Sequence, residues 1–332
     1  MPRYKKFKIF LNYFLGPLLF VFILFSIYKQ VSNQPQLEAH WQHIKDVLAN
    51  SGKGYLIAAM VLMFLNWGLE SRKWQILTSH VHPTRFRTAV KSVMAGVSFT
   101  MLTPNRMGEF LGRVLYLPDG SRVRGATLMF LSSMSQLAIT LLAGVTGLFF
   151  LKANAPQLSS QTEGWTGMLV NAMVVGSSLC MLVGLILYFN IGWLIRQVEK
   201  ITPFSKYATY IHVIGEIHKG ELVKILGISL IRYVVFLVQY LLVFRFFETG
   251  IEIWPMAACT AVMFLMLAII PTIALAELGV RGQVSLFVFG LFSSNSLEIL
   301  IASAVIWIIN IIFPAAAGSF ILLTVKIFRK DP

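Results

Sequence analysis

Long runs of apolar, almost uncharged residues recur along this chain and restrict what it can fold into. They lie at residues 9–28, 55–69, 125–151, 166–189, 222–247 and 298–323. Most exceed the roughly 18 residues that mark a helix able to cross the ~30 Å hydrocarbon core of a bilayer. Only 13% of the residues are charged, compared with roughly 25% in an average soluble domain. We therefore expect an all-α integral membrane protein, a polytopic helical bundle with about six full spans in a single transmembrane domain over residues 1–332.

The basic residues flank these runs and do not gather on a soluble module. Because loops rich in Lys and Arg stay on the cytoplasmic side, this arrangement places both termini inside and predicts a multi-pass protein of the cell (inner or plasma) membrane. The formal net charge of +14 then reflects topology, and we expect no nucleic-acid partner. Glu70, Arg72 and Lys73 are expected at the cytoplasmic end of the second span.

Residues 29–54 form a polar segment that this topology places outside. Its apolar residues recur at helical spacing: Leu37, Trp41, Ile44 and Leu48. This pattern predicts an amphipathic helix lying on the membrane surface.

Several kinds of chemistry are not expected. Cys180 and Cys259 both lie inside apolar runs, which argues against a disulfide framework or a cysteine-based metal site. The sequence contains no Walker A loop, no Rossmann glycine fingerprint and no G-x-S-x-G elbow. We therefore expect no catalytic residues, no metal and no cofactor, so that any transport runs on a gradient or downhill.

The apolar run at residues 88–117 is interrupted near its middle by polar residues. If Thr103 caps a new helix and Pro104 occupies its first turn, free amides and the positive end of the helix dipole face the bilayer interior. Such an end favours an anion. Arg106 adds a full charge beside it, next to Asn105, and charges at this depth usually mark a site or a pathway. We expect a re-entrant helical hairpin that enters from the cytoplasmic side.

A matching interruption lies in residues 254–293. In both interrupted segments a proline precedes a Glu-x-x-x-Arg pair, Glu109 with Arg113 and Glu277 with Arg281, which suits an ion pair within one helix. The last span must begin outside, so this second segment enters and returns, as a hairpin from the opposite side or as two thin spans. Two broken segments in corresponding positions indicate an inverted-repeat transporter with its site between the repeats.

The alternative is that these arginines extend to lipid headgroups and the glutamates only neutralise them. Arg232, inside the fifth long run, is a further candidate with the same two interpretations. Polar residues expected to join helices are Asn66, Gln136, Gln239 and Asn310. The candidate substrate-binding residues are Thr103, Pro104, Asn105, Arg106, Glu109, Arg113, Arg232, Glu277 and Arg281.

Residues 103–109, Thr-Pro-Asn-Arg-Met-Gly-Glu, together with Arg113 and with residues 278–281, Leu-Gly-Val-Arg, resemble a known family. The family is the lysylphosphatidylglycerol synthase transmembrane region, also called the flippase-like domain, and the resemblance covers nearly the whole chain. It implies a multi-pass bundle with paired re-entrant helices. It also implies movement of a phospholipid or a polyprenyl-phosphate-linked lipid between leaflets.

Two features depart from that family. Its second motif usually reads Gly-Gly-Leu-Gly-Val-Arg-Glu, whereas here Glu277 precedes the motif and Gly282 follows Arg281. The chain also ends shortly after its last span, so the soluble aminoacyl-transferase half of some relatives, and lysine transfer to lipid, are not expected.

The leading hypothesis is a lipid flippase-like protein without an enzymatic domain. Arg106, Arg113 and Arg281 would hold a headgroup phosphate, while Glu109 and Glu277 would pair with arginines in the empty site or receive a cationic headgroup. A second hypothesis is a membrane-embedded transferase acting on lipid-linked substrates, with one of these glutamates as general base. A third is a non-catalytic partner of a lipid or cell-envelope biosynthesis complex, and the oligomeric state stays open. The basic inner loops suit anionic lipid or an acidic partner equally.

Overall fold

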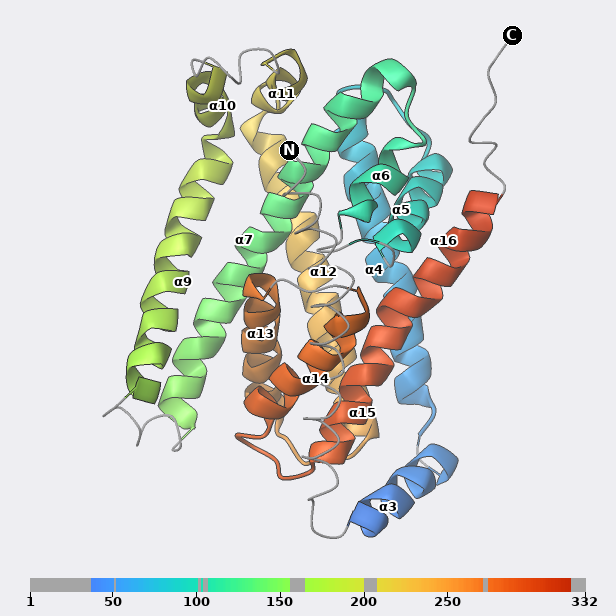
Figure 1. The fold of residues 1–332 in the computed structure, drawn as a ribbon, viewed down its shortest axis with the longest axis vertical. Coiled ribbons are helices and arrows are strands. Elements are labelled where there is room, and N and C mark those ends of the chain that lie inside the picture. The colour runs from blue at the N-terminus through green and yellow to red at the C-terminus, as the bar shows by residue number, and fades with distance from the viewer. Residues whose placement is uncertain are drawn as a thin grey trace, which may run out of the picture.

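The computed structural model describes residues 37–50, 52–100, 103, 107–155, 165–199, 208–270 and 274–323, and every regular element in these ranges is helical (Figure 1). Within these described ranges, five helical stretches are long and apolar enough to cross a membrane. They are α4 (Gly54–Thr78), α7 (Arg122–Asn154), α9 (Trp165–Phe189), α12 (Lys219–Phe246), and α15 (Ser296–Trp307) continuing through a π-helical turn (Ile308–Ile312) into α16 (Phe313–Leu323). Helices therefore occupy five of the six predicted spans. The predicted span at residues 9–28 lies outside the described residues.

Four shorter helices form the two interrupted segments. α5 (Phe86–Thr100) and α6 (Gly108–Val114) pack against each other, and so do α13 (Ile253–Ile269) and α14 (Ala274–Phe289). In Figure 1, α4 begins at the lower end, beside α3, and α12 begins at the upper end, beside α11. Because α5 follows α4 and α13 follows α12, the two helical pairs start from opposite ends of the bundle.

The packing of the bundle repeats between two sets of helices. α4 packs along α12, α5 packs on α16, and α13 packs on α7; α6 also contacts α7 and α14 contacts α15. Exchanging α4–α7 with α12–α16 leaves this pattern unchanged. The bundle therefore has the arrangement of two related halves that run in opposite directions, as expected for inverted repeats.

Glycines allow the first helical pair to pack closely. A Cβ atom added to Gly112 would lie 2.5–2.6 Å from backbone atoms of Ala95 and Gly96 on α5, and one added to Gly108 would collide with the Phe99 carbonyl group. Small residues let helix backbones approach in membranes, where association depends on packing contacts. The α5–α6 pair is thus fixed by direct backbone contact.

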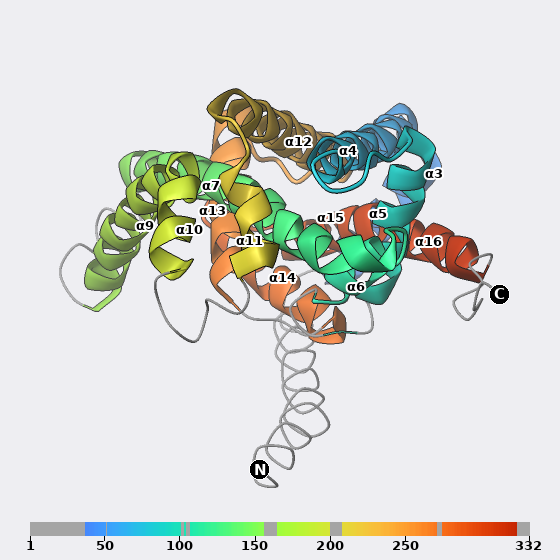
Figure 2. The same cartoon turned by 90° about the horizontal axis from the view of Figure 1, so that it is seen from above.

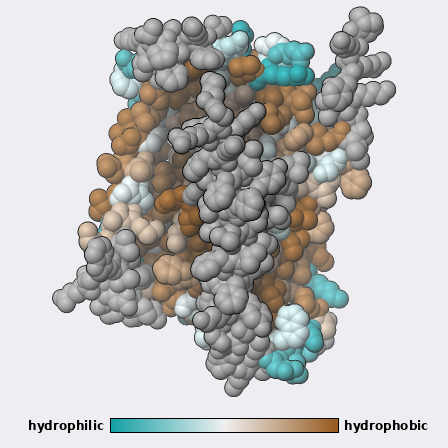
Figure 3. All heavy atoms as spheres, in the orientation of Figure 1, coloured by the Kyte–Doolittle hydropathy of each residue, from teal (hydrophilic) through white to brown (hydrophobic). Residues whose placement is uncertain are grey.

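The outer surface matches a membrane environment. Hydrophobic side chains occupy the middle of the molecule and hydrophilic side chains gather toward its two ends (Figure 3). On α9, large apolar side chains such as Val175 and Leu179 are exposed, as expected for a helix that faces lipid. The structure thus agrees with a multi-pass membrane protein.

The predicted amphipathic helix is present as α3 (Leu37–Asn50). Its buried residues are Ile44 and Val47, which join the apolar cluster of the second half, whereas Trp41 and Leu48 are exposed. The exposed Trp41 and Leu48 suit a helix that presents apolar residues to the membrane surface, and this position stays a prediction; α3 also packs against α15. Two short helices, α10 (Ile191–Glu199) and α11 (Ala208–Gly215), lie at the opposite end of the bundle (Figure 1).

Candidate functional site

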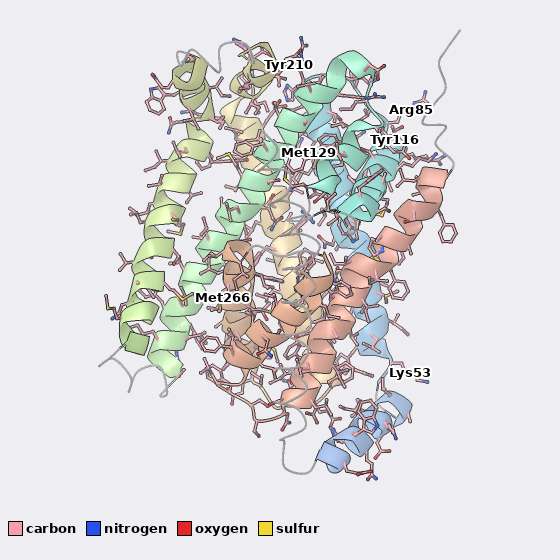
Figure 4. All side chains as sticks on the ribbon, in the orientation of Figure 1. Lys53, Arg85, Tyr116, Met129, Tyr210 and Met266 are labelled. Atoms are coloured by element: carbon pink, nitrogen blue, oxygen red, sulfur yellow. The ribbon has the colours of Figure 1, made fainter. Side chains whose placement is uncertain are left out.

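A cavity of about 710 Å³ lies between the two helical pairs, with walls from α4, α6, α7, α12, α13, α14, α15 and the π-helical turn. Met129, labelled in Figure 4, belongs to its α7 wall. Both Glu-x-x-x-Arg pairs line this cavity. Among the described residues, those around it with charged side chains are Glu70, Lys73, Glu109, Arg113, Arg232, Glu277 and Arg281.

Glu70, on α4, lies at the centre of a cluster of charged residues to which α4, α6 and α12 contribute. Its Oε1 accepts a hydrogen bond from Arg113 Nη1 at 2.7 Å, and its Oε2 accepts one from Arg232 Nη1. Lys73 Nζ lies 3.0 Å from the same Oε2 atom. Glu70 is only 4% exposed, so one buried carboxylate serves three cations from three helices.

Arg113 has a second carboxylate partner and also contacts an aromatic ring. Its Nη2 donates to Glu109 Oε1, four residues earlier on α6, and its guanidinium lies 5.7 Å from the centre of the Trp74 ring. The Trp74 indole donates to Ser92 Oγ, which in turn donates to the Arg113 carbonyl oxygen. These contacts connect α4, α5 and α6 around one guanidinium.

Arg232 extends from α12 toward α4 and α7. Its Nε donates to Asn66 Oδ1 at 2.9 Å, and its Nη1 also donates to Gln136 Oε1 at 3.2 Å. Asn66 and Gln136 therefore join helices as predicted, but they do so by holding a guanidinium that lines the cavity. Gln239 joins α12 to α4 through the Ala59 carbonyl oxygen.

The second half holds its arginine differently. Arg281 Nη2 donates to Glu277 Oε1 at 3.1 Å, within α14. Its Nη1 donates to the hydroxyl of Tyr240 on α12 at 2.9 Å. The Tyr240 ring contacts those of Phe244, Phe264 and Phe289, so an aromatic cluster fixes the hydroxyl beside the guanidinium.

The interpretation that these arginines extend to lipid headgroups is wrong for the three described ones. Arg113, Arg232 and Arg281 are buried, and each contacts a carboxylate inside the bundle. A snorkelling side chain would instead place its charge at the outer rim of the helix. Charges held this far inside a membrane protein usually mark a functional pathway.

Thr103 links the end of α5 to the start of α6. Its Oγ1 accepts a hydrogen bond from the Gly108 amide at 2.5 Å and donates to the Phe99 carbonyl oxygen at 3.2 Å. The helix that follows begins at Gly108, later than the sequence pattern predicts. Pro104, Asn105 and Arg106 lie outside the described residues, so their predicted contacts stay predictions.

Glu70 and Lys73 were missed as site residues. The sequence prediction places them at the cytoplasmic end of the second span, but α4 continues to Thr78 and both side chains are buried against the cavity. The signal that could have found them is spacing, because Asn66, Glu70 and Lys73 lie at i, i+4 and i+7 and so share one helix face.

Tyr240 and Asn310 are further cavity residues that were not assigned to the site. In the sequence, Tyr240 is one of several aromatic residues in a long apolar run, and nothing there marks it as a site residue. Asn310, predicted to join helices, lies in the π-helical turn, and its amide donates within its own helix to the Ile306 carbonyl oxygen. π-helical turns inside α-helices are frequent at functional sites.

Among the described residues, the cavity is lined by four cationic and three anionic side chains. This leaves one excess positive charge if all are ionised. Guanidinium groups offer planar pairs of donors that match phosphate oxygens. The arrangement therefore suits an anionic group carried in from the membrane.

The family model for the lysylphosphatidylglycerol synthase TM region matches residues 13–318. No curated protein matches the chain, and no solved structure does.

Proposed function

This chain belongs to the family of the lysylphosphatidylglycerol synthase transmembrane region, and from that premise we propose that it moves a phosphate-bearing lipid headgroup between the two membrane leaflets. The lipid is a phospholipid or a polyprenyl-phosphate-linked lipid of the inner or plasma membrane. The observation that carries the proposal is a cavity lined by charged residues of both helical pairs. A chain that served only as an anchor would not need the seven charged side chains that the described residues place around one internal cavity.

Stability alone does not account for these charges. Burying an ion pair costs several kcal/mol of desolvation per ion, and replacing such a pair by apolar residues is often neutral or stabilising. A headgroup phosphate needs this kind of environment, because it cannot cross hydrocarbon without partners for its charge. The cavity supplies those partners in a molecule whose outer surface is apolar.

In the empty site, Glu70 and Glu109 neutralise Arg113 and Glu277 neutralises Arg281. An incoming phosphate takes the place of these carboxylates on the guanidinium groups. Since Glu70 also contacts Arg232 and Lys73, its release exposes three cations together. A cationic part of the headgroup would pair with the displaced carboxylates.

The two helical pairs act as re-entrant hairpins from opposite membrane faces. Their exchangeable packing suits a mechanism in which one half tilts against the other around a site near the midplane, opening it first to one face and then to the other. The lipid chains stay in the hydrocarbon while the headgroup passes through the cavity.

The transferase hypothesis is less favoured by the geometry. Glu109 and Glu277 are the glutamates it would use as general base, and both accept hydrogen bonds from arginine. A carboxylate held this way serves as a counter-charge and is poorly placed to take a proton from a substrate hydroxyl. Product analysis after incubation with a lipid extract separates the two hypotheses, because transport alone leaves the lipids chemically unchanged.

The experiment is reconstitution into liposomes that carry a fluorescent phosphatidylglycerol, with a membrane-impermeant quencher to report which leaflet it occupies. The wild-type protein should expose the inner-leaflet label to the quencher, whereas Arg106→Ala and Arg281→Ala should slow this exposure strongly. Unchanged rates in both variants would overturn the site assignment. No movement by the wild-type protein would favour the third hypothesis, a non-catalytic partner of a biosynthesis complex.

A further inference from the structure

A second hollow, which we call the lateral groove, opens between α4, α5 and α16 and has a volume of about 510 Å³. The three helices lie on the same side of the bundle (Figure 2), where α5 packs on both α4 and α16. All the residues around it are apolar: Met60, Met63, Phe64, Trp67, Gly68, Phe86, Val90, Met94, Phe313, Pro314 and Ala317. Its chemistry is therefore the opposite of that of the charged cavity.

The lateral groove and the charged cavity meet at Trp67, which lines both. On α4, the groove residues Phe64 and Gly68 alternate with Asn66 and Glu70, which contact the cavity arginines. At about 100° per residue these positions fall on two different faces of α4, one apolar and one charged, with Trp67 between them. A molecule that fits both hollows must therefore have a hydrocarbon part and an anionic part that meet beside Trp67.

The lateral groove also opens toward the outside of the bundle. Phe64 is 69% exposed and Phe313 is 49% exposed, so its rim belongs to the surface that lies in the hydrocarbon of the bilayer. In the bilayer, this rim is in contact with the acyl chains of phospholipids. The occupant can therefore arrive laterally, without passing through water.

We propose that the lateral groove holds one acyl chain of a phospholipid while the phosphate of the same lipid lies in the charged cavity. This inference rests on the proposed function of that cavity. Hydrocarbon in the bilayer is as apolar as the groove, so the groove gains little energy from the chain itself. The groove instead gives the acyl chain a place beside α4. The headgroup can then enter the cavity while the acyl chain stays away from the charged side chains.

The residues of the groove suit a flexible chain. Met60, Met63 and Met94 have unbranched, adaptable side chains that fill irregular space around different ligands. Gly68 provides part of the open volume, because a Cβ atom added there would meet no atom within 4 Å. A larger side chain at this position therefore fills the groove without disturbing the helix packing.

Gly68→Leu is the test variant, and Gly184→Leu on α9 is its matched control. Gly184 is also half-buried in a long helix with open space around its added Cβ atom, and it lines neither hollow. Both substitutions raise helix propensity, so neither is expected to unfold the protein. Thermal unfolding of both variants in detergent verifies this before the lipid experiment.

The experiment uses the full chain in nanodiscs with phosphatidylglycerol that carries a photoreactive diazirine midway along one acyl chain. A diacylglycerol with the same chain but no phosphate is the comparison probe. After illumination, mass spectrometry measures adducts on the groove residues and on the exposed face of α9. If the headgroup anchors the chain, the ratio of phosphatidylglycerol to diacylglycerol adducts should be about tenfold higher in the groove than on α9, since one charge-assisted contact is worth at least that factor.

Gly68→Leu should bring the groove ratio down to the α9 value, and Gly184→Leu should leave it unchanged. Equal ratios in the groove and on α9 of the wild-type protein would overturn the proposal, and so would an absence of adducts in the groove, as expected if the apolar segment 9–28 covers it. Groove labelling that unlabelled polyprenyl phosphate suppresses, but equimolar unlabelled phosphatidylglycerol does not, would assign the groove to an isoprenoid chain and overturn the acyl assignment.

Leaflet exchange measured with the same variants in sealed liposomes separates this inference from the proposed function. Groove enrichment without lipid movement supports chain binding and contradicts translocation. Lipid movement without groove enrichment contradicts only the lateral groove.

Discussion

The two helical pairs carry the same Glu-x-x-x-Arg pattern but hold their arginines in different surroundings. On the side of the first pair, Glu70 and Glu109 contact Arg113 and Lys73, and Arg232 extends from α12 to join them. On the side of the second pair, Arg281 contacts the Glu277 carboxylate and the Tyr240 hydroxyl. The excess positive charge of the cavity thus lies around Glu70, where Arg232 is added, and we expect this to be the stronger phosphate site, whereas the charges of Glu277 and Arg281 balance each other.

The halves also differ in how closely their hairpins pack. Gly108 and Gly112 lie one residue before Glu109 and Arg113, and Gly112 permits backbone contact between α5 and α6. The matching positions of the second motif are occupied by Ala276 and Val280. The glycines that allow the close contact of α5 and α6 therefore have no counterpart at the matching positions of the second motif. The comparison shows that a shared motif determines the position of the arginine but not the charge or the packing around it.

The largest expected effect is that of removing the central carboxylate. Glu70→Gln leaves three buried cations with Glu109 as their remaining carboxylate, so the free energy of unfolding should fall by about 3–5 kcal/mol. Glu277→Gln should cost less, because Glu70 contacts three cations, whereas Arg281 keeps its hydrogen bond to the Tyr240 hydroxyl. Thermal unfolding in one detergent measures both, with exposed Glu252→Gln as the control that should change nothing. Equal losses in the two halves would contradict the comparison.

The second largest effect is expected from a steric clash between α5 and α6. Gly112→Ala places a methyl group 2.5–2.6 Å from the α5 backbone, and we expect a loss of about 3 kcal/mol, near the upper end for overpacking. Val280→Ala, at the matching position, removes atoms without a clash and should cost less. Gly227→Ala on α12, where an added Cβ atom meets open space, should be neutral or stabilising. If Gly112→Ala were as stable as the wild-type protein, the close packing of α5 and α6 would not be required.

The smallest expected effect concerns the Tyr240 hydroxyl, which is the second partner of Arg281, whereas the second partner of Arg113 is a carboxylate. Tyr240→Phe removes the 2.9 Å bond to Arg281 and should cost about 2 kcal/mol, the range for hydrogen bonds to charged groups. Tyr188→Phe is the matched control, because its hydroxyl donates at 2.9 Å to the neutral carbonyl of Leu222 and should cost about 1 kcal/mol. Differential scanning fluorimetry compares them. A Tyr240→Phe loss no larger than that of the control would show that Arg281 does not depend on this hydroxyl.

Much of the fold could be predicted from hydropathy alone. Apolar runs identified five spans as helices, and the interrupted runs identified both helical pairs, because hydrocarbon forces backbone groups to bond within each helix. The boundaries were less predictable. The charges of Glu70 and Lys73 predict that the second span ends before them. In the structure α4 continues past both residues, which lie on its inner face.

The candidate site was predictable only where both partners lie in one helix. Glu109 with Arg113, and Glu277 with Arg281, are four residues apart, so their pairing follows from helical geometry. The contact of Glu70 with Arg232 joins residues 162 positions apart, and that of Arg281 with Tyr240 depends on how α12 and α14 pack. Such contacts follow from tertiary structure, which local spacing does not encode.

The central claim is that one headgroup passes both halves of the cavity, and leaflet exchange by paired variants tests it most directly. The rate of lipid movement in liposomes should be measured for Arg113→Gln, Arg281→Gln and the double variant. If both arginines serve one pathway, each single variant should lower the rate at least about tenfold, the worth of one charge-assisted contact, and the double variant should be little slower than either. A single variant that moves lipid at the wild-type rate would contradict the account.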